Sequence, residues 1–348
     1  MGMETHGSDR AFDYSVVIRT LGTAGAKYRA LLASLKAQTV PPREILVVLP
    51  EGSPVPPDRL GLERFVSAPR GPVHQREAGM RLARGAYLLV CDDDIEFDPD
   101  FVERLSRTAL STGAEVVLPN VLSPEDDEPR PVMAWAKHAR DILCGNSYVS
   151  SRPSRYAIRI AGTGGYIKKA SIEPGRQDYS QSGHGTCSLV KRSAAESLRF
   201  DDEIWLEEAG YALPEDQVMF YKAFLQGRRL ACCRAAVCRH LDAGSSEIGR
   251  MEAMVYAHAR NFTVFWHRFM FQTSPSERRR IFLVGCLAFR ILNNEIYYAL
   301  TSLARPARLP LLRTLGRGYV DAFRYLRSDA YRRLPRILDR RIDERALV

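Results

Sequence analysis

The sequence predicts an α/β fold, with a mostly parallel sheet flanked by helices and a helical C-terminal extension. Short apolar runs alternate with amphipathic stretches from residue 14 onward, and parallel strands need helical crossovers of this kind. One apolar run ends in three consecutive aspartates, and such sheets bind ligands beyond the carboxyl ends of their strands. From Met251 onward the pattern becomes helical.

The predicted strands are runs rich in Val, Ile and Leu. The first reads Tyr-Ser-Val-Val-Ile-Arg-Thr, and the last ends at His240. Seven such runs are expected to form strands, at 14–20, 44–49, 64–66, 86–90, 114–119, 186–190 and 228–239.

The predicted helices lie between and after these strands. Residues 26–37 place apolar side chains at helical spacing, and two prolines from Pro41 end the segment. Residues 213–227 carry a proline and two acids in the first turn and stop at a glycine. Further helices are expected at 73–84, 99–111 and 281–303.

Three segments are predicted to be loops. Residues 123–131 are acidic and rich in proline, which is typical of a surface loop. Residues 162–165 and 180–185 are rich in glycine but lack the Lys-Ser/Thr spacing of a phosphate-binding loop. We expect both glycine-rich segments to line the functional site.

Length and composition indicate a globular protein of one large or two small domains. Of the 348 residues 45% are hydrophobic and 26% charged, which is ordinary for a folded chain. We expect a disordered segment at 1–13, an α/β domain at 14–248 and a basic helical region at 249–348. Seven cysteines without paired spacing favour reduced thiols over disulfides or zinc.

Neither a secretory signal nor a membrane-spanning helix is predicted. Residues 1–13 are polar, and the most apolar stretch, 281–304, is interrupted by Arg290, two asparagines and Glu295. The sequence therefore predicts a cytoplasmic protein.

Three adjacent carboxylates, Asp92-Asp93-Asp94, follow the strand at 86–90. Like charges this close repel one another unless solvent or a cation neutralises them. Mg²⁺ and Mn²⁺ prefer oxygen ligands, and nucleotide phosphates can complete their coordination. A solvated turn is the alternative, but the position at a strand end favours a ligand site.

A second acidic motif, the pair Glu215-Asp216, lies in the first turn of the helix predicted at 213–227. Acids are common in a first helical turn because they interact favourably with the helix dipole. A carboxylate is also a competent general base for a hydroxyl group. The order of the motifs along the chain favours the catalytic interpretation.

Taken in order, these motifs resemble the family 2 glycosyltransferases, which are inverting enzymes with the GT-A fold, over residues 14–246. The aspartate triplet matches the family's strand-end DxD motif, and residues 70–85 resemble the glycine–arginine–glycine segment before it. The pair Glu215-Asp216 matches the family's Glu-Asp pair, which supplies the catalytic base.

The resemblance implies a role for each candidate residue. Asp216 would be the general base, with Glu215 positioning it or touching the acceptor. Asp94 and His240 would bind Mn²⁺ or Mg²⁺. The donor, expected to be a UDP-sugar, would contact Arg19, Thr20, Glu51, Arg70, Gly71, Arg76, Asp92 and Asp93, and the acceptor would contact His184 and Gly185.

One motif departs from the family. Its second strand usually ends in Asp-Asp-Gly-Ser or a similar sequence that contacts the nucleotide base. This chain has Leu-Pro-Glu-Gly-Ser at residues 49–53, so Glu51 takes that place and the base of the donor stays open.

The positive charge of the chain is concentrated in its C-terminal tail. The net charge is +9, and residues 301–348 hold twelve arginines and five acids, a net of +7 that leaves +2 for the rest. Arginines alternate with apolar and aromatic residues over 311–338, which favours contact with an anionic membrane surface. A solvated helical face, a contact between copies in a homo-oligomer and a nucleic-acid patch are the alternatives, and no nucleic-acid-binding fold accompanies the charge.

The sequence thus predicts a metal-dependent inverting glycosyltransferase at the inner face of the cell membrane. Its acceptor would be a glycan or a lipid-linked sugar in bacterial surface polysaccharide or glycolipid synthesis. A sugar nucleotidyltransferase is disfavoured because residues 22–26 lack a following Arg-x-x-Pro. A membrane-docked scaffold with an inactive transferase fold would bind lipid but neither metal nor nucleotide.

Overall fold

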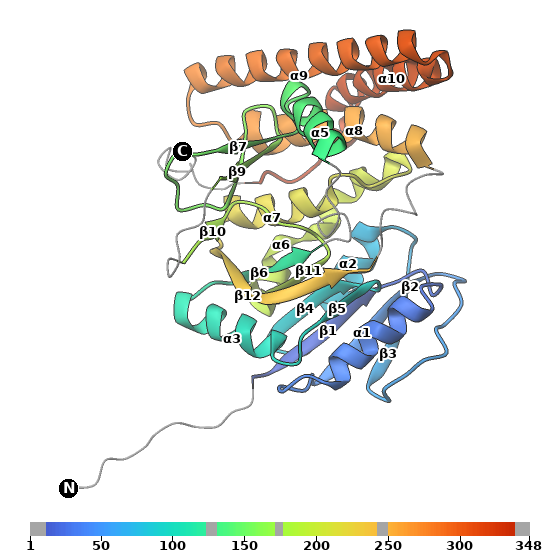
Figure 1. Cartoon of the computed structure of the whole chain (residues 1–348), viewed down its shortest axis with the longest axis vertical. Coiled ribbons are helices and arrows are strands. Elements are labelled where there is room, and N and C mark those ends of the chain that lie inside the picture. Colours follow the sequence, from blue (N-terminus) through green and yellow to red (C-terminus); the bar gives the residue numbers. More distant parts are fainter. Residues whose placement is uncertain (1–11, 123–130, 171–176, 242–249, 338–348) are drawn as a thin grey trace, which may run out of the picture.

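The computed structural model describes residues 12–122, 131–170, 177–241 and 250–337. A nine-stranded sheet lies in the lower half of the molecule in Figure 1, and the C-terminal helices stack at the opposite end. The strands are β1 (Tyr14–Arg19), β2 (Glu44–Pro50), β3 (Glu63–Ala68), β4 (Tyr87–Asp92), β5 (Ile95–Phe97), β6 (Val116–Leu122), β7 (Ser147–Ser150), β8 (Ile158–Ile160), β9 (Tyr166–Lys169), β10 (Tyr179–Ser180), β11 (Cys187–Lys191) and β12 (Leu230–His240).

Helices connect these strands and continue after the last of them. They are α1 (Ala26–Lys36), α2 (Pro72–Leu82), α3 (Phe101–Thr112), α5 (Pro131–Leu143), α6 (Arg192–Leu198), η1 (Phe200–Ala209), α7 (Glu215–Leu225), α8 (Met251–Phe265), the π-helical η3 (Trp266–Phe271), α9 (Glu277–Ala304), η4 (Pro306–Arg308), α10 (Leu309–Leu326) and α11 (Asp329–Arg332).

The main sheet is mostly parallel, as predicted. Its order is β10-β12-β6-β11-β4-β1-β2-β3, with β5 pairing to β12. The pairs β1–β2, β1–β4, β2–β3 and β12–β6 are parallel. Because β11 is antiparallel to both β4 and β6, those two strands also share one direction, so six strands point the same way.

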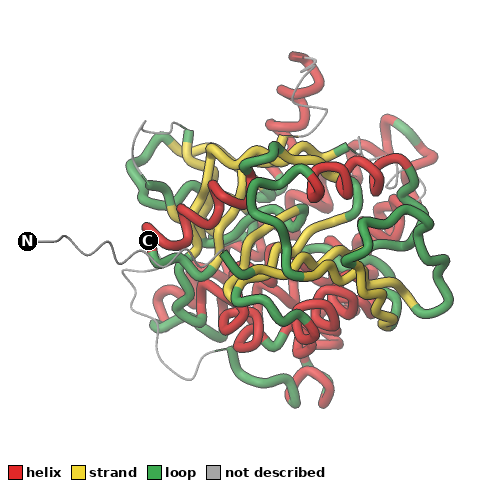
Figure 2. Tube along the Cα trace, turned by 90° about the horizontal axis from the view of Figure 1, so that it is seen from below, coloured by secondary structure: helices red, strands yellow, loops and turns green. Residues whose placement is uncertain are grey.

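Alternating side chains of the strands build a core on each face of the sheet. On β1, Val16 and Ile18 pack with α1 and α3, whereas Val17 packs on the side of α2 and α7. This alternation follows from the two-residue period of a strand. Seen from below in Figure 2, the strands lie between these two groups of helices.

The C-terminal helices share a core with the α/β layer. Phe265 of α8, Leu287 of α9 and Ala322 of α10 belong to the same buried cluster as Val17 and Phe220. Among the described residues, no helix combines the length and apolarity that a membrane span needs.

The region between β6 and β11 differs from the prediction. It holds helix α5 and a separate sheet with the order β7-β9-β8. The strands of this sheet are three or four residues long and half polar, so no clear period marks them in the sequence. The surface loop predicted at 123–131 and the segment 1–13 lie almost entirely outside the described residues, as does the domain boundary at 248.

Candidate functional site

The register of β1 and β4 brings the first two site residues together. The strands pair in parallel with Arg19 opposite Asp92, so both residues stand at the same carboxyl edge of the sheet. The Nε and Nη2 atoms of Arg19 donate to Oδ1 of Asp92 at 2.9 and 2.7 Å. The first aspartate of the triplet is therefore held by a forked guanidinium contact.

A buried arginine joins three segments behind this edge. Arg76 of α2 is 1% exposed, and its Nη1 donates to Oε1 of Glu215 at 3.0 Å. Its Nη2 donates to the carbonyl oxygen of Gly185 at 2.9 Å and to Oδ1 of Asp92 at 3.3 Å. One guanidinium thus fixes the acidic strand end, the loop before β11 and the start of α7 relative to one another.

The acidic pair at the start of α7 faces the aspartate triplet. Asp216 accepts hydrogen bonds from the backbone N–H groups of Gln217, at 2.7 Å, and of Gly185, at 3.3 Å. Burial raises the pKa of both Glu215 and Asp216 above the ordinary range, and Arg76 opposes the rise. A carboxylate with a raised pKa is a stronger general base, so Asp216 suits the abstraction of a proton.

Gly185 lies where these elements meet. A Cβ atom there would stand 2.7 Å from Cβ of Asp216 and 2.9 Å from Nη2 of Arg76. Glycine is therefore required at this position by close approach, which lets its backbone contact both side chains.

The second and third aspartates differ in their surroundings. Asp93 accepts a short hydrogen bond from the hydroxyl of Thr20, and burial raises its pKa to about 6. The Oδ1 atom of Asp94 is buried without a hydrogen-bond partner, and its Oδ2 lies 3.2 Å from Nε2 of His240. Antiparallel pairing of β12 with β5 places His240 opposite Ile95 and so beside Asp94.

These two side chains fit a divalent cation. The unpartnered oxygen of Asp94 is a hard ligand, and the imidazole nitrogen of His240 is a second possible ligand for Mn²⁺. Within the described ranges, no group of three or more His, Cys, Asp or Glu side chains is placed to hold a metal ion. Two protein ligands would leave coordination positions for phosphate oxygens and water.

A cavity of about 870 Å³ lies at this edge of the sheet. Most of the predicted site residues line it: Arg19, Thr20, Arg70, Gly71, Arg76, Asp92, Asp93, Asp94, Gly185, Glu215 and Asp216. His240 is not a lining residue itself, but its Nε2 contacts Asp94, which is. Glu51 and His184 are exposed and do not belong to the lining, and the glycines at 162–165 also lie outside it.

The structure adds a lining residue that no sequence motif indicated. Oε1 of Glu207 accepts a hydrogen bond from the backbone N–H of Val73 at 2.7 Å, at the start of α2. Burial raises the pKa of Glu207 to about 7, while the bond from Val73 opposes the rise. Three acids precede it within residues 201–206 and another follows directly, and only folding distinguishes Glu207 from them. Lys27, Gln75, Tyr211 and Arg250 also line the cavity.

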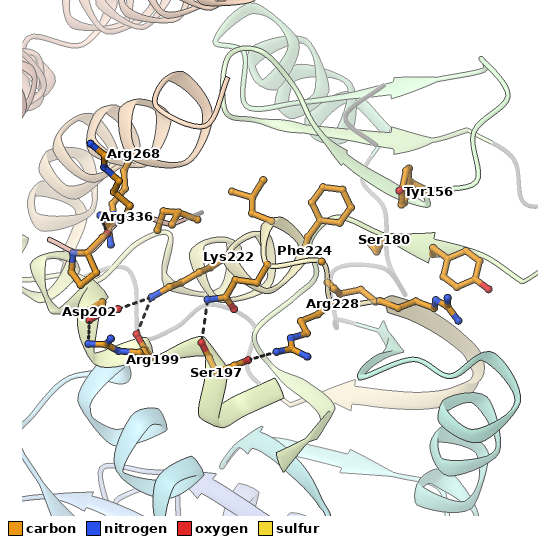
Figure 3. A pocket seen from close by; sticks show the side chains of 18 of the residues that line it. Tyr156, Ser180, Ser197, Arg199, Asp202, Lys222, Phe224, Arg228, Arg268 and Arg336 are labelled. Atoms are coloured by element: carbon orange, nitrogen blue, oxygen red, sulfur yellow. Dashed lines mark hydrogen bonds and ion pairs between the residues drawn. The ribbon is translucent and has the colours of Figure 1, made fainter. Parts of the chain in front are cut away.

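A larger cavity, of about 1020 Å³, lies at the other end of α7 (Figure 3). Its lining is rich in cations, and its one acid, Asp202, pairs with Arg199 and Lys222. Among the described residues of this lining, the acid is thus already paired with two cations. The predicted acidic motifs line the smaller cavity instead.

Residues 64–199 match the family model described as Glycosyl transferase family 2. This segment is a family 2 glycosyltransferase domain. It contains α2, the aspartate triplet and β11, while the Glu215-Asp216 pair follows it in the chain. The predicted family resemblance and fold class are both confirmed. A comparison with curated protein sequences gives no match.

Solved structures of similar shape were also found. GalNAc-T7, crystallised with UDP, GalNAc and Mn²⁺, is 14% identical with a TM-score of 0.48, and the alignment covers 84% of this chain. This chain spans 58% of the length of that one. Residues 1–349 of TarS from S. aureus, crystallised with UDP, are 13% identical with a TM-score of 0.43. That alignment covers 90% of this chain and 91% of the TarS chain.

Proposed function

We propose that this glycosyltransferase moves a sugar from a nucleotide-sugar donor to an acceptor hydroxyl with inversion at the anomeric carbon. The observation that carries the proposal is the meeting of two acidic motifs in one cavity. The aspartate triplet and the Glu215-Asp216 pair are far apart in the chain, yet Arg76 contacts both. One motif suits the phosphates and the other suits the acceptor.

Asp216 is the proposed general base. It would take the proton from the acceptor hydroxyl as the hydroxyl oxygen bonds to the anomeric carbon and the bond to the diphosphate breaks. The two backbone N–H groups that bind Asp216 hold its carboxylate in place, and Arg76 holds Glu215 beside it. Glu215 is thus a positioning residue for the base.

Donor binding is proposed at the aspartate edge. Arg19, Arg70 and Lys27 supply positive charge in the cavity, and guanidinium groups pair well with phosphate. Asp94 and His240 would hold Mn²⁺ or Mg²⁺, which supplies Lewis-acid stabilisation of the departing diphosphate. We propose a UDP-sugar as the donor, although the chain lacks the motif with which the family usually contacts the nucleotide base.

The acceptor is proposed to be a glycan or a lipid-linked sugar in bacterial surface polysaccharide or glycolipid synthesis. Its site of action would be the inner face of the cell membrane. The basic C-terminal region supports this location because anionic headgroups attract arginines.

Ligand-induced thermal stabilisation tests donor and metal binding. A ligand that binds only the native state raises the melting temperature, so UDP with Mn²⁺ should stabilise the wild type more than UDP alone. Asp94→Ala should lose the metal-dependent part, and Asp58→Ala, which removes an acid paired with Arg29 that does not line the cavity, should keep it. No shift with any nucleoside diphosphate would favour an inactive scaffold instead.

Turnover tests the base. Asp216→Asn should lower the transfer rate by roughly 10² to 10⁴ and leave UDP-dependent stabilisation in place. A transferase also differs from a sugar nucleotidyltransferase in its products. Release of pyrophosphate from a nucleoside triphosphate and a sugar phosphate would contradict the proposal.

A further inference from the structure

Helix α9 buries three of its polar side chains. Its inner face consists of Leu283, Leu287, Arg290, Asn294 and Ser302. Arg290 donates to the carbonyl oxygen of Gly145 at 3.0 Å and lies 3.0 Å from Nε2 of His258, while Asn294 donates to the carbonyl oxygen of Cys144 at 3.2 Å. Two of the polar residues that interrupt the apolar sequence, Arg290 and Asn294, are therefore used inside the protein.

The outer face of α9 is apolar. Every exposed residue from 281 to 304 is apolar or glycine, and the two charged residues of this stretch are the buried Arg290 and the half-buried Glu295. Leu303 is 81% exposed, and the other large side chains of this face are Ile281, Phe282, Val284, Phe289, Leu292, Ile296 and Leu300. A surface helix of a globular protein normally has the opposite arrangement.

This face covers a long edge of the molecule. Figure 1 shows α9 as the outermost element at the end opposite the sheet, with α5 beneath it and α10 beside it. At 1.5 Å per residue, its 28 residues extend over about 42 Å. Contiguous exposed apolar patches of this kind mark interaction sites.

Arginines stand at both ends of the apolar face. Arg278 and Arg279 precede it, next to Glu277, which is paired with Arg280, and Arg305 and Arg308 follow it. An antiparallel pairing of two copies through α9 would bring the first pair against the second, and a parallel pairing would bring each pair against itself. Either arrangement places like charges together, whereas anionic lipid headgroups complement both ends.

Helix α10 exposes fewer large apolar side chains than α9, namely Leu309, Val320 and Phe323. Its apolar residues Leu315, Tyr319 and Ala322 are buried, with Leu315 and Tyr319 packed against Val255 and Ala259 of α8. Part of the amphipathic pattern over 311–338, which the sequence suggested for membrane contact, is thus used within the protein.

We propose that the outer face of α9 docks in the interfacial layer of an anionic membrane, with the helix parallel to the bilayer plane. The apolar side chains would enter the acyl boundary, and the terminal arginines would contact the headgroups. The inference deepens the membrane location proposed above. Its test uses neither donor nor acceptor, so it fails or succeeds independently of the transferase activity.

Vesicle sedimentation tests the proposal with the full-length chain. The wild type should bind vesicles of phosphatidylcholine mixed with phosphatidylglycerol, and more weakly vesicles of phosphatidylcholine alone. The double variant Phe289→Glu/Leu292→Glu should bind at least about tenfold more weakly, because it replaces two apolar contacts with charges that anionic lipid repels. The control Leu110→Glu changes a 69% exposed leucine on α3, at the other end of the molecule, and should bind like the wild type.

Two results would overturn the proposal. One is vesicle binding by the double variant at the level of the wild type. The other is a wild-type dimer in light scattering that ignores vesicles and that the double variant dissociates, which would make this face an interface between copies. Circular dichroism melts of each variant show that the fold is retained, as expected for exposed positions.

Discussion

Replacing Arg76 by methionine should destabilise the fold strongly. The guanidinium is almost fully buried and contacts Glu215, Asp92 and the carbonyl oxygen of Gly185. Methionine keeps the unbranched shape but leaves Glu215 without its hydrogen-bonded cation, whereas Asp92 keeps its contacts with Arg19. Removing one partner of a buried ion pair costs about 3 to 5 kcal/mol.

The loss should depend on pH in a definite direction. Without Arg76, the folded-state pKa of Glu215, already raised by burial, rises further. A carboxyl group whose folded pKa exceeds its unfolded pKa destabilises the fold where it is ionised, and the penalty shrinks as pH falls through the folded pKa. The difference in unfolding free energy between wild type and variant should therefore be largest near pH 8 and decrease toward pH 5.

Urea unfolding monitored at several pH values measures this difference. Arg81→Met is the matched control because Arg81 lies on the same helix and is exposed. A loss for Arg76→Met below about 1 kcal/mol, or one equal to that of Arg81→Met, would refute the role of Arg76 as the shared counterion.

Two further predictions concern stability. The pKa of Glu207 is raised from 4.5 to about 7 in the folded state, so the fold loses stability as pH rises from about 4.5 to 7, where the unfolded state is ionised and the folded state keeps its proton. Glu207→Gln should flatten the stability profile over this range, and the exposed Glu196→Gln should not, as thermal melts at several pH values would show. In α10, Gly318→Ala should lower the melting temperature because its Cβ would stand 2.7 Å from Cβ of Ala259. Gly316→Ala should raise it, since that Cβ meets nothing closer than 3.6 Å and alanine favours a helix by about 1 kcal/mol. Equal effects of the two alanine substitutions would show that α8 and α10 are not closely packed.

The parallel half of the sheet could be predicted because its strands are buried on both faces. Such strands are continuous apolar runs, and β1, β2 and β4 lie within a residue or two of the predicted bounds. The reversed direction of β11 could not be predicted, since a strand carries the same apolar pattern in either direction. The short β5 was missed because three residues show no period.

The candidate site was predictable where a motif coincided with a strand or helix end. The aspartate triplet and the Glu215-Asp216 pair satisfy this condition, and the cavity contains both. Glu51 also follows a strand, yet its side chain is exposed outside the cavity. Glu207 depends on the packing of η1 against the start of α2, a tertiary contact that no local pattern records.

Because the packing around Gly185 is close, a substitution there changes the geometry of the cavity without changing its charge. Alanine at this position would push on both Asp216 and Arg76 while every ionisable group of the cavity stays in the sequence. An inactive form made this way would keep the net charge of the native protein, unlike Asp216→Asn. The Gly185→Ala variant would therefore serve as an inactive reference protein in binding studies where the electrostatic attraction of donor or membrane must be held constant.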